Sequence, residues 1–362
     1  MHPDCFYMAR ALLLAERGRG STSPNPMVGA VVVDQDEVVV GSGSHRYAGG
    51  PHAEVYALRE AGPRARGATL YCTLEPCSHV GRTGPCAPAI ADAGIARVVV
   101  ATEDPNPLVN GRGLALLRAR GVAVRSGVLG DEARALNRSF LSLMLRRRPF
   151  VTIKVALSRD GRVAAAPGVR TPLTGAAANR FIHRERAEVD AVAVGSGTVL
   201  ADEPRLTARG AFRRRPLTRV VFDTRLRTPP GAKLLSTLGA GPVIIISTPS
   251  AAVEASGRAA ALAEAGAEVI CVPEEDRLAG ALQVLGARGI SSLMVEGGTT
   301  LHRALWDSRL VDRVQTFRTP HRLGPQGLGW LPASIFQGAL TNVTRTRLGD
   351  DELIEGYVHR SD

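Results

Sequence analysis

The chain has 362 residues, enough for two domains of about 150 residues each. Hydrophobic residues make up 44% of it, and no apolar run reaches the ~18 residues that a membrane span needs, so we expect no membrane partner. A net charge of +11 and an isoelectric point near 10.3 raise the question of nucleic acid. Aromatic residues make up only 4% and the arginines are scattered, so we expect no base-stacking platform and no nucleic-acid partner.

The N-terminus and the cysteines indicate the compartment. The first four residues lack the basic and apolar regions of a signal peptide. Five cysteines are an odd number, which does not suit a disulfide framework. We therefore expect a cytoplasmic protein whose thiols stay reduced.

Helical and strand patterns alternate along the first 146 residues. Apolar residues at helical spacing predict a helix over 4–18. Strands are expected at 27–33, 38–43, 68–72 and 98–101, and further helices at 53–61, 87–93 and 131–145. This alternation is typical of a layered α/β domain.

An arginine run that ends in proline, 146–149, follows as a linker, because proline stops a helix. A second α/β series begins after it. Its strands are expected at 151–157, 191–195, 219–222, 243–247, 268–272 and 292–295. We therefore expect an α/β protein with a first domain over 1–146 and a second over 149–362.

A metal-binding pattern lies in the first domain. His52, Cys77 and Cys86 supply one imidazole and two thiols, which a tetrahedral zinc ion prefers, and the fourth position stays open for water. Glu54 stands two residues after the histidine, where a carboxylate that does not bind the metal could move protons. A His-x-Glu followed by Pro-Cys and another Cys is the signature of zinc deaminases. We expect one zinc ion per chain, with Glu54 as a catalytic residue.

Eight residues separate the two cysteines, where nucleobase deaminases usually have two. With this insertion, the segment 74–86 closely resembles the deaminase part of the bifunctional riboflavin biosynthesis family, in which a pyrimidine deaminase is fused to a reductase. The segments 24–30, 43–45 and 104–107 match as well. The resemblance implies a cytidine-deaminase-like three-layer domain. It also implies a pyrimidine and phosphate pocket lined by Asn25, His45, His79 and Arg82.

The second domain carries motifs of its own at strand ends. The segment 154–161, which begins with Lys154, ends one predicted strand and enters a turn, and Gly297 and Gly298 follow another strand before a helix. Such a glycine turn lets backbone N–H groups approach a pyrophosphate at a helix N-terminus. Gly195-x-Gly197 lacks the third glycine of the Rossmann fingerprint, so we do not predict that fold.

Together these segments resemble the reductase half of the same family, which has the dihydrofolate reductase fold and uses NADPH. The resemblance implies a catalytic residue, Lys154, and substrate-binding residues at Arg170, Arg186, Leu206, Arg209 and Glu296. It implies that the cofactor is bound by Ala156, Pro172, Thr198, Asp202, Thr224, Gly297, Gly298 and Thr299.

Three positions depart from the family pattern. Arg159 replaces a leucine, Arg170 a serine and Pro172 a tryptophan. We expect an active reductase, with a degenerate reductase half as the alternative.

The resemblance predicts two reactions. The first is hydrolytic deamination of 2,5-diamino-6-ribosylamino-4(3H)-pyrimidinone 5′-phosphate. The second is NADPH-dependent reduction of the ribose of 5-amino-6-(5-phosphoribosylamino)uracil to ribitol. Two other functions remain open: a tRNA deaminase, favoured by the basic charge, and a zinc-stabilised protein that only binds another polypeptide. We also expect a homo-oligomer.

Overall fold

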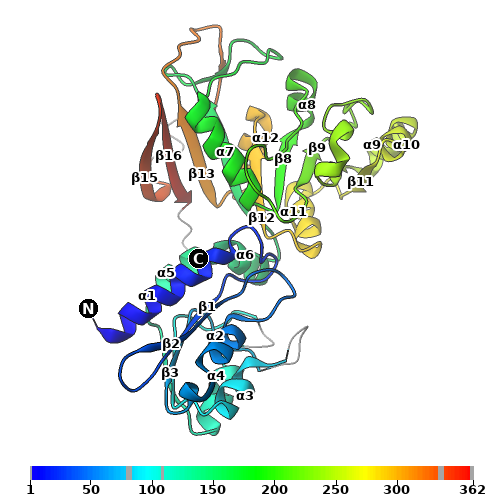
Figure 1. The fold of residues 1–362 in the computed structure, drawn as a ribbon. Coiled ribbons are helices and arrows are strands. Elements are labelled where there is room, and N and C mark those ends of the chain that lie inside the picture. Colours follow the sequence, from blue (N-terminus) through cyan, green and yellow to red (C-terminus); the bar gives the residue numbers. More distant parts are fainter. Residues whose placement is uncertain (1, 79–83, 107–109, 333–337, 359–362) are drawn as a thin grey trace. The chain divides into compact units, whose positions relative to one another are not determined.

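The computed structural model describes residues 2–78, 84–106, 110–332 and 338–358. The chain divides into two compact units, Met1–Arg147 and Arg148–Asp362 (Figure 1). No helix in the described ranges is long and apolar enough to cross a membrane.

Within its described part, the first unit contains one sheet of five strands in the order β2-β1-β3-β4-β5. Strand β1 is antiparallel to both β2 and β3, whereas β3, β4 and β5 are parallel. The strands are β1 Gly29–Val33, β2 Val39–Ser44, β3 Thr69–Cys72, β4 Arg97–Val100 and β5 Ala123–Ser126. The helices are α1 Pro3–Ala15, α2 Ala53–Ala61, α3 Cys86–Asp92, α4 Arg112–Ala119, α5 Gly130–Leu136 and α6 Arg138–Arg146.

Alternating side chains of this sheet form two cores. In β1, Ala30 and Val32 pack with α2, α3 and α4, whereas Val31 and Val33 pack with α1 and α5. Successive side chains of a strand point to opposite faces, so a strand of continuous apolar residues can be buried on both sides. The unit is therefore a three-layer α/β domain, as the sequence predicted.

The predicted helix over 131–145 is wrong as a single element. The chain breaks at Asn137, between α5 and α6, where the backbone has φ −103° and ψ 22°. The Asn137 side chain accepts a hydrogen bond from the Met27 N–H at 2.8 Å and donates one to the Met27 carbonyl at 2.9 Å. This contact with a distant segment explains the break. The sequence patterns also missed α4 and β5.

In the described part of the second unit, the main sheet has nine strands in the order β11-β10-β9-β8-β12-β6-β13-β16-β15. In this order, the first seven strands, from β11 at the edge to β13, are parallel to one another. At the other edge, β16 pairs antiparallel with β13, and β15 pairs antiparallel with β16. Their bounds are β6 Phe150–Leu157, β8 Ala191–Gly195, β9 Thr218–Phe222, β10 Val243–Ser247, β11 Ala267–Cys271, β12 Ser292–Glu296, β13 Arg313–Arg318, β15 Leu340–Leu348 and β16 Asp351–Val358. A separate pair joins β7 Arg162–Ala164 to β14 Leu328–Gly329.

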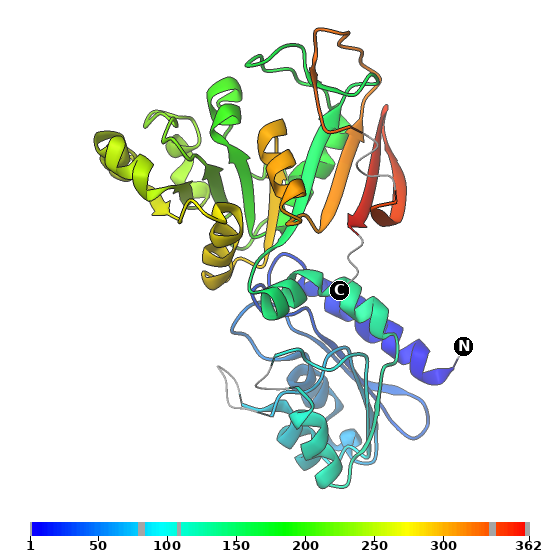
Figure 2. The same cartoon turned by 180° about the vertical axis from the view of Figure 1, so that it is seen from behind.

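Helices cover both faces of this sheet, with α7 in front in Figure 1 and α12 in front in Figure 2. In β8, Ala191 and Ala193 pack with α11 and α12, and Val192 and Val194 pack with α8 and α10. The helices are α7 Ala176–Glu188, α8 Ser196–Asp202, α9 Pro249–Glu254, α10 Ser256–Glu264, α11 Arg277–Ala287 and α12 Thr299–Asp307. The six strands predicted here are all present, and β13, β15 and β16 were missed.

Candidate active sites

Three metal-ligating side chains meet in the first unit. His52 is the N-cap of α2, Cys86 is the first residue of α3, and Cys77 lies between β3 and α3. The ligand atoms of these three residues lie within 4.8 Å of one another. The His52 Nδ1 atom is 3.2 Å from the Cys86 sulfur and 3.6 Å from the Cys77 sulfur. The fold thus brings together the three residues that the sequence predicts as zinc ligands.

The spacing of these atoms fits a tetrahedral zinc ion. Zn–N bonds of about 2.1 Å and Zn–S bonds of about 2.3 Å separate a nitrogen and a sulfur ligand by roughly 3.6 Å. The observed separations of 3.2 and 3.6 Å are close to this value. A hydrogen bond from the Cys86 thiol lowers the pKa of Cys77, which favours the thiolate that zinc binds.

Glu54 lies beside these ligands in the first turn of α2 and is 4% exposed. Burial raises the pKa of its carboxyl group, and the neighbouring His52 opposes that increase. Among the described residues, the cluster that could hold a metal contains His52, Cys77 and Cys86 without Glu54. A buried carboxyl group next to a metal site, and outside its ligand set, is suited to proton transfer.

Two further predicted residues lie next to the metal-ligating cluster. The Asn25 Nδ2 atom is 3.3 Å from His45 Nε2, and His45 Nδ1 is 3.0 Å from the carbonyl oxygen of Pro51. The His45 ring centroid is 5.7 Å from that of His52, with the ring planes at 89°. Burial lowers the pKa of His45, so its ring favours the neutral form. The other two predicted pocket residues, His79 and Arg82, lie outside the described residues.

Glu75, which the sequence patterns did not identify, holds the segment before Cys77. Its carboxylate is 3% exposed and accepts hydrogen bonds of 2.9 to 3.3 Å from four backbone N–H groups, those of Asp104, Gly111, Gly113 and Leu114. A Cβ atom at Gly113 would come within 1.9 Å of the Pro76 carbonyl oxygen, so only glycine fits there. These contacts fix the backbone next to a metal ligand.

The second unit contains a cavity of 500 Å³ where parallel strands end. The residues predicted to face the substrate all line it: Lys154, Arg170, Arg186, Leu206, Arg209 and Glu296. Residues predicted to bind the cofactor line it as well, and two of them, Ala156 and Pro172, line this cavity alone. Ligands of open parallel sheets bind at the carboxyl ends of the strands, where this cavity lies.

An adjoining cavity of 490 Å³ is lined by the other predicted cofactor-binding residues, namely Thr198, Asp202, Thr224, Gly297, Gly298 and Thr299. All of these except Thr224 line the 500 Å³ cavity too, so the two cavities share a wall. Arg227 and Arg277 also line the 490 Å³ cavity and were not predicted. Sequence patterns could not single out these two residues, because each is an isolated arginine in a chain rich in arginine.

A buried ion cluster occupies one wall of the substrate cavity. Lys154 and Glu296 are neighbours on the parallel strands β6 and β12, and their Nζ and Oε2 atoms are 3.6 Å apart. Arg186 donates to both carboxylate oxygens of Glu296, at 2.6 and 2.8 Å. Burial raises the pKa of Glu296, but the charges of Arg186 and Lys154 outweigh it and lower this pKa to about 2. Burial lowers the pKa of Lys154.

The turn between β12 and α12 requires glycine. Gly297 has φ 82° and Gly298 has φ 85°, values that other residues rarely adopt. A Cβ atom at Gly297 would lie 3.2 Å from the Thr198 hydroxyl. The turn places two residues without Cβ atoms, and the N-terminus of α12, beside both cavities. This arrangement fits the pyrophosphate of a dinucleotide such as NADPH.

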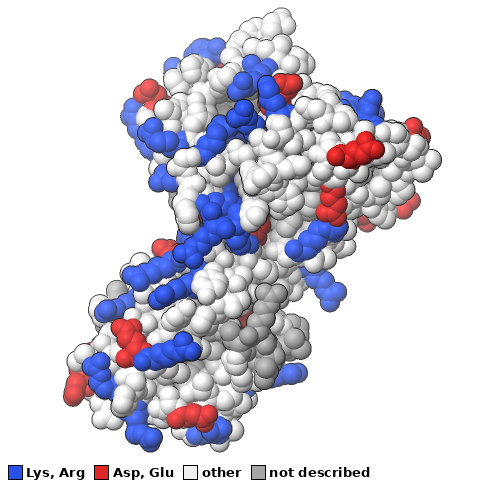
Figure 3. All heavy atoms as spheres, turned by 45° about the vertical axis from the view of Figure 1, so that its right-hand side comes forward, with Lys and Arg blue, Asp and Glu red and all other residues white. Residues whose placement is uncertain are grey.

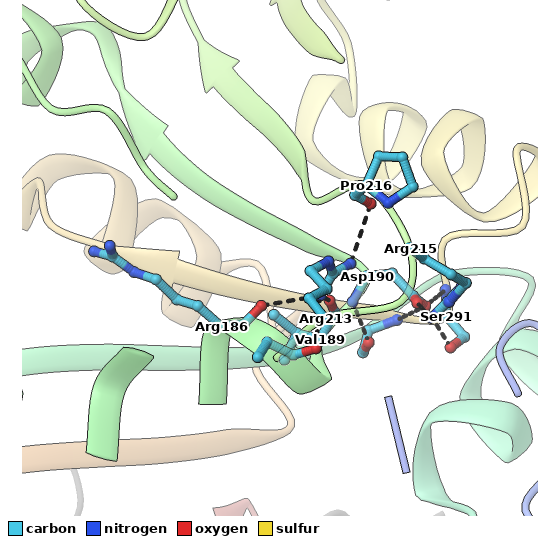
Figure 4. A network of polar contacts seen from close by, with 9 residues as sticks. Arg186, Val189, Asp190, Arg213, Arg215, Pro216 and Ser291 are labelled. Atoms are coloured by element: carbon cyan, nitrogen blue, oxygen red, sulfur yellow. Dashed lines mark hydrogen bonds and ion pairs between the residues drawn. The ribbon is translucent and has the colours of Figure 1, made fainter. Parts of the chain in front are cut away.

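Polar contacts hold the end of α7, the helix that carries Arg186 (Figure 4). The Arg213 guanidinium donates to the backbone oxygens of Arg186 at 3.0 Å and of Val189 at 2.5 Å. Asp190 accepts from Arg215 at 2.5 Å in the same network. Arg213 thus satisfies carbonyl groups that the helix end leaves unpaired, and Arg215 pairs with the Asp190 carboxylate beside it. In the sequence these arginines form only a short basic cluster.

Known protein families divide the chain in the same way. The family described as "Cytidine and deoxycytidylate deaminase zinc-binding region" matches residues 1–102, and that described as "RibD C-terminal domain" matches residues 149–351. Riboflavin biosynthesis protein RibD of Aquifex aeolicus is 42% identical over 89% of this chain and 88% of its own length. This chain belongs to the RibD family. RibD of Escherichia coli is 40% identical over 90% of both chains.

Solved RibD structures share the whole fold. Acinetobacter baumannii RibD superposes with a TM-score of 0.87, at 36% identity over 99% of both chains. A diaminohydroxyphosphoribosylaminopyrimidine deaminase/5-amino-6-(5-phosphoribosylamino)uracil reductase from Thermotoga maritima gives 0.84, at 32% identity over 99% of both chains. The RibD family therefore accounts for a zinc-binding deaminase domain followed by a reductase domain of the dihydrofolate reductase type, as the sequence predicted. The chain is a bifunctional deaminase and reductase of riboflavin biosynthesis.

Proposed function

We propose that the residues around Glu54 deaminate 2,5-diamino-6-ribosylamino-4(3H)-pyrimidinone 5′-phosphate. The observation that carries this proposal is a buried carboxyl group beside two thiols and an imidazole whose spacing fits zinc. Zinc, when bound, lowers the pKa of a water molecule towards neutrality. Glu54 takes the two protons of the attacking water one after the other, delivering the first to the ring nitrogen and the second to the leaving amine.

Neighbouring residues orient the pyrimidine in this proposal. His45 and Asn25 form a polar pair 3.3 Å apart, next to the His52 ring. Burial favours the neutral form of His45, and its Nδ1 atom donates to the Pro51 carbonyl oxygen. Its Nε2 atom can therefore accept a hydrogen bond at the ring edge without adding charge. We propose that His79 and Arg82 contribute to the same pocket.

We propose that the second unit reduces 5-amino-6-(5-phosphoribosylamino)uracil. NADPH, when bound, supplies the hydride. Lys154 donates a hydrogen bond and then a proton to the ribose ring oxygen, so the ring opens as C1′ accepts the hydride. Glu296 holds Lys154 in place, and the decrease in the Lys154 pKa on burial makes the ammonium a better proton donor.

Arginines in the same cavity suit the substrate phosphate. Arg170 and Arg209 line it with exposed side chains, whereas Arg186 is committed to Glu296. The Arg209 backbone N–H donates to His183 Nδ1 at 3.2 Å, which ties the loop carrying Arg209 to α7. We propose that Arg170 and Arg209 bind the phosphate, since guanidinium groups pair with phosphate oxygens.

We infer that the domains over 1–146 and 149–362 each hold one activity, and that the partners are small phosphorylated pyrimidines. Within each unit, Lys and Arg side chains form several separate groups on the face seen in Figure 3, which favours small substrates over nucleic acid. We also propose that the protein is cytoplasmic, because metal-ligating thiols need a reducing compartment. A homo-oligomer is a separate proposal, kept from the sequence analysis.

The test is turnover of the diaminopyrimidine phosphate with and without NADPH. Ammonia release without NADPH, followed by NADPH oxidation once it is added, is the expected result. Ammonia release with no NADPH oxidation would favour a degenerate reductase half. Inosine formed in tRNA, with no reaction on the pyrimidine, would favour a tRNA deaminase instead.

A further inference from the structure

A tryptophan lines the substrate cavity at a place that no sequence pattern indicated. Trp330 follows β14, is half-buried, and shares the 500 Å³ cavity with Lys154, Glu296 and Pro172. Pro172 is the position at which the sequence departs from a tryptophan. The cavity nevertheless contains an aromatic side chain, which comes from a different segment of the chain.

The Trp330 ring is held by a chain of hydrogen bonds. Its indole N–H donates to His302 Nδ1 at 3.1 Å, and His302 Nε2 lies 3.2 Å from the carbonyl oxygen of Val295. An indole nitrogen can only donate and a carbonyl oxygen can only accept, so His302 must be neutral with its proton on Nε2. Burial lowers the pKa of His302 to about 4, which agrees with that state at neutral pH.

The backbone before Trp330 is held as well. Strand β14 pairs with β7, and a Cβ atom at Gly327 would lie 2.9 Å from the Arg162 side chain. Val163 of β7 lines both cavities. Residue Trp330 is thus held both through the backbone before it and through its indole N–H group. The side chain therefore loses little further conformational entropy when a ligand binds.

We propose that Trp330 is the aromatic wall on which the pyrimidine ring of the reductase substrate stacks. This proposal rests on the reductase function proposed above. With the N–H group bonded to His302, the indole offers a flat apolar surface, which a planar heterocycle covers by stacking. Trp330 and His302 line the 500 Å³ cavity, with its lysine and arginines, and are not among the residues lining the 490 Å³ cavity. Ala156 and Pro172 of the predicted cofactor-binding set line this cavity too, so the assignment rests on the reacting groups that share it with Trp330. These are Lys154 and Glu296, and they assign the pyrimidine, not the nicotinamide, to Trp330.

Tryptophan fluorescence tests the contact directly. The chain has two tryptophans, so Trp306→Phe leaves Trp330 as the single reporter and Trp330→Phe leaves Trp306 as the matched control. We expect 5-amino-6-(5-phosphoribosylamino)uracil to quench the Trp330 emission saturably and to leave the Trp306 emission unchanged after correction for absorbance. Equal quenching of both reporters, or quenching of Trp330 by NADP⁺ alone and not by the uracil, would overturn the proposal.

Kinetics provide the second measurement. Trp330→Leu should raise KM for the uracil about tenfold, which corresponds to about 1.4 kcal/mol, and change KM for NADPH less than twofold. Trp330→Phe keeps a flat ring and should recover most of the loss. An unchanged KM for NADPH reports that the second unit, which carries Trp330, is folded, and deamination by the same variants reports that the first unit is folded. A wild-type chain that does not reduce the uracil contradicts the proposed function, whereas normal reduction by Trp330→Leu contradicts only the stacking role.

Discussion

Replacing Glu296 with glutamine tests the buried ion cluster of the second unit. The folded pKa of this carboxyl group is about 2, against an ordinary value of 4.5. At about 1.36 kcal/mol for each pKa unit, this difference corresponds to roughly 3 kcal/mol of stability at neutral pH. Glu296→Gln also leaves Lys154 and Arg186 buried without their anion, and breaking a buried pair typically costs about 3–5 kcal/mol. We therefore expect the free energy of unfolding of the second unit to fall by about 3 kcal/mol.

The pH dependence gives the sign of the effect. Because folding lowers the pKa of Glu296, its contribution is complete above pH 4.5 and decreases as the pH falls from 4.5 towards 2. The difference between wild type and Glu296→Gln should therefore shrink on acidification.

Denaturant unfolding measured by tryptophan fluorescence is the assay, since both tryptophans lie in the second unit. Glu268→Gln is the matched control. Glu268 pairs with Arg288 at 2.7 Å on the surface, with side chains 53% and 39% exposed, so its loss should cost less than about 1 kcal/mol. Equal unfolding free energies for Glu296→Gln and Glu268→Gln, or a difference that does not shrink in acid, would refute this reasoning.

Three further predictions concern the two sites. Glu54→Gln should keep one zinc per chain by metal analysis and lose ammonia release by ~100-fold or more; unchanged release would remove Glu54 from the mechanism. Gly298→Val should weaken NADPH binding by at least about tenfold, because its φ of 85° excludes a branched residue, and should leave deamination intact; a fluorescence titration with unchanged affinity would place the pyrophosphate elsewhere. Removing zinc with a chelator should abolish deamination and leave reduction of supplied uracil largely intact. Equal loss of both activities in a chain whose circular dichroism is unchanged would contradict two separate sites.

Short-range patterns predicted the features that depend on neighbouring residues. The ligands His52 and Cys86 stand at helix N-termini that follow predicted strands, and the fold brings them within 3.2 Å. Strands that are buried on both faces appear in the sequence as apolar runs, which is why β1, β8 and β10 were predicted.

Features that depend on distant segments could not be predicted in this way. Strand β15 is exposed along almost its whole length and reads as a polar, arginine-containing segment, so its pairing with β16 left no apolar pattern. The break at Asn137 depends on Met27, which lies 110 residues away. Glu75 finds its four N–H donors 29 to 39 residues later in the chain. Trp330 lines the substrate cavity directly after β14, which pairs with β7, a strand far away in the sequence.

The central claim is that this one chain performs both steps on one pyrimidine. Mass spectrometry of the product formed from the diaminopyrimidine phosphate and NADPH deuterated at the transferred position tests it most directly. The account predicts a product in which oxygen replaces one exocyclic nitrogen and one deuterium is bound at C1′ of a ribitol chain. A deaminated product that still contains ribose, with no deuterium after prolonged incubation, would contradict the account.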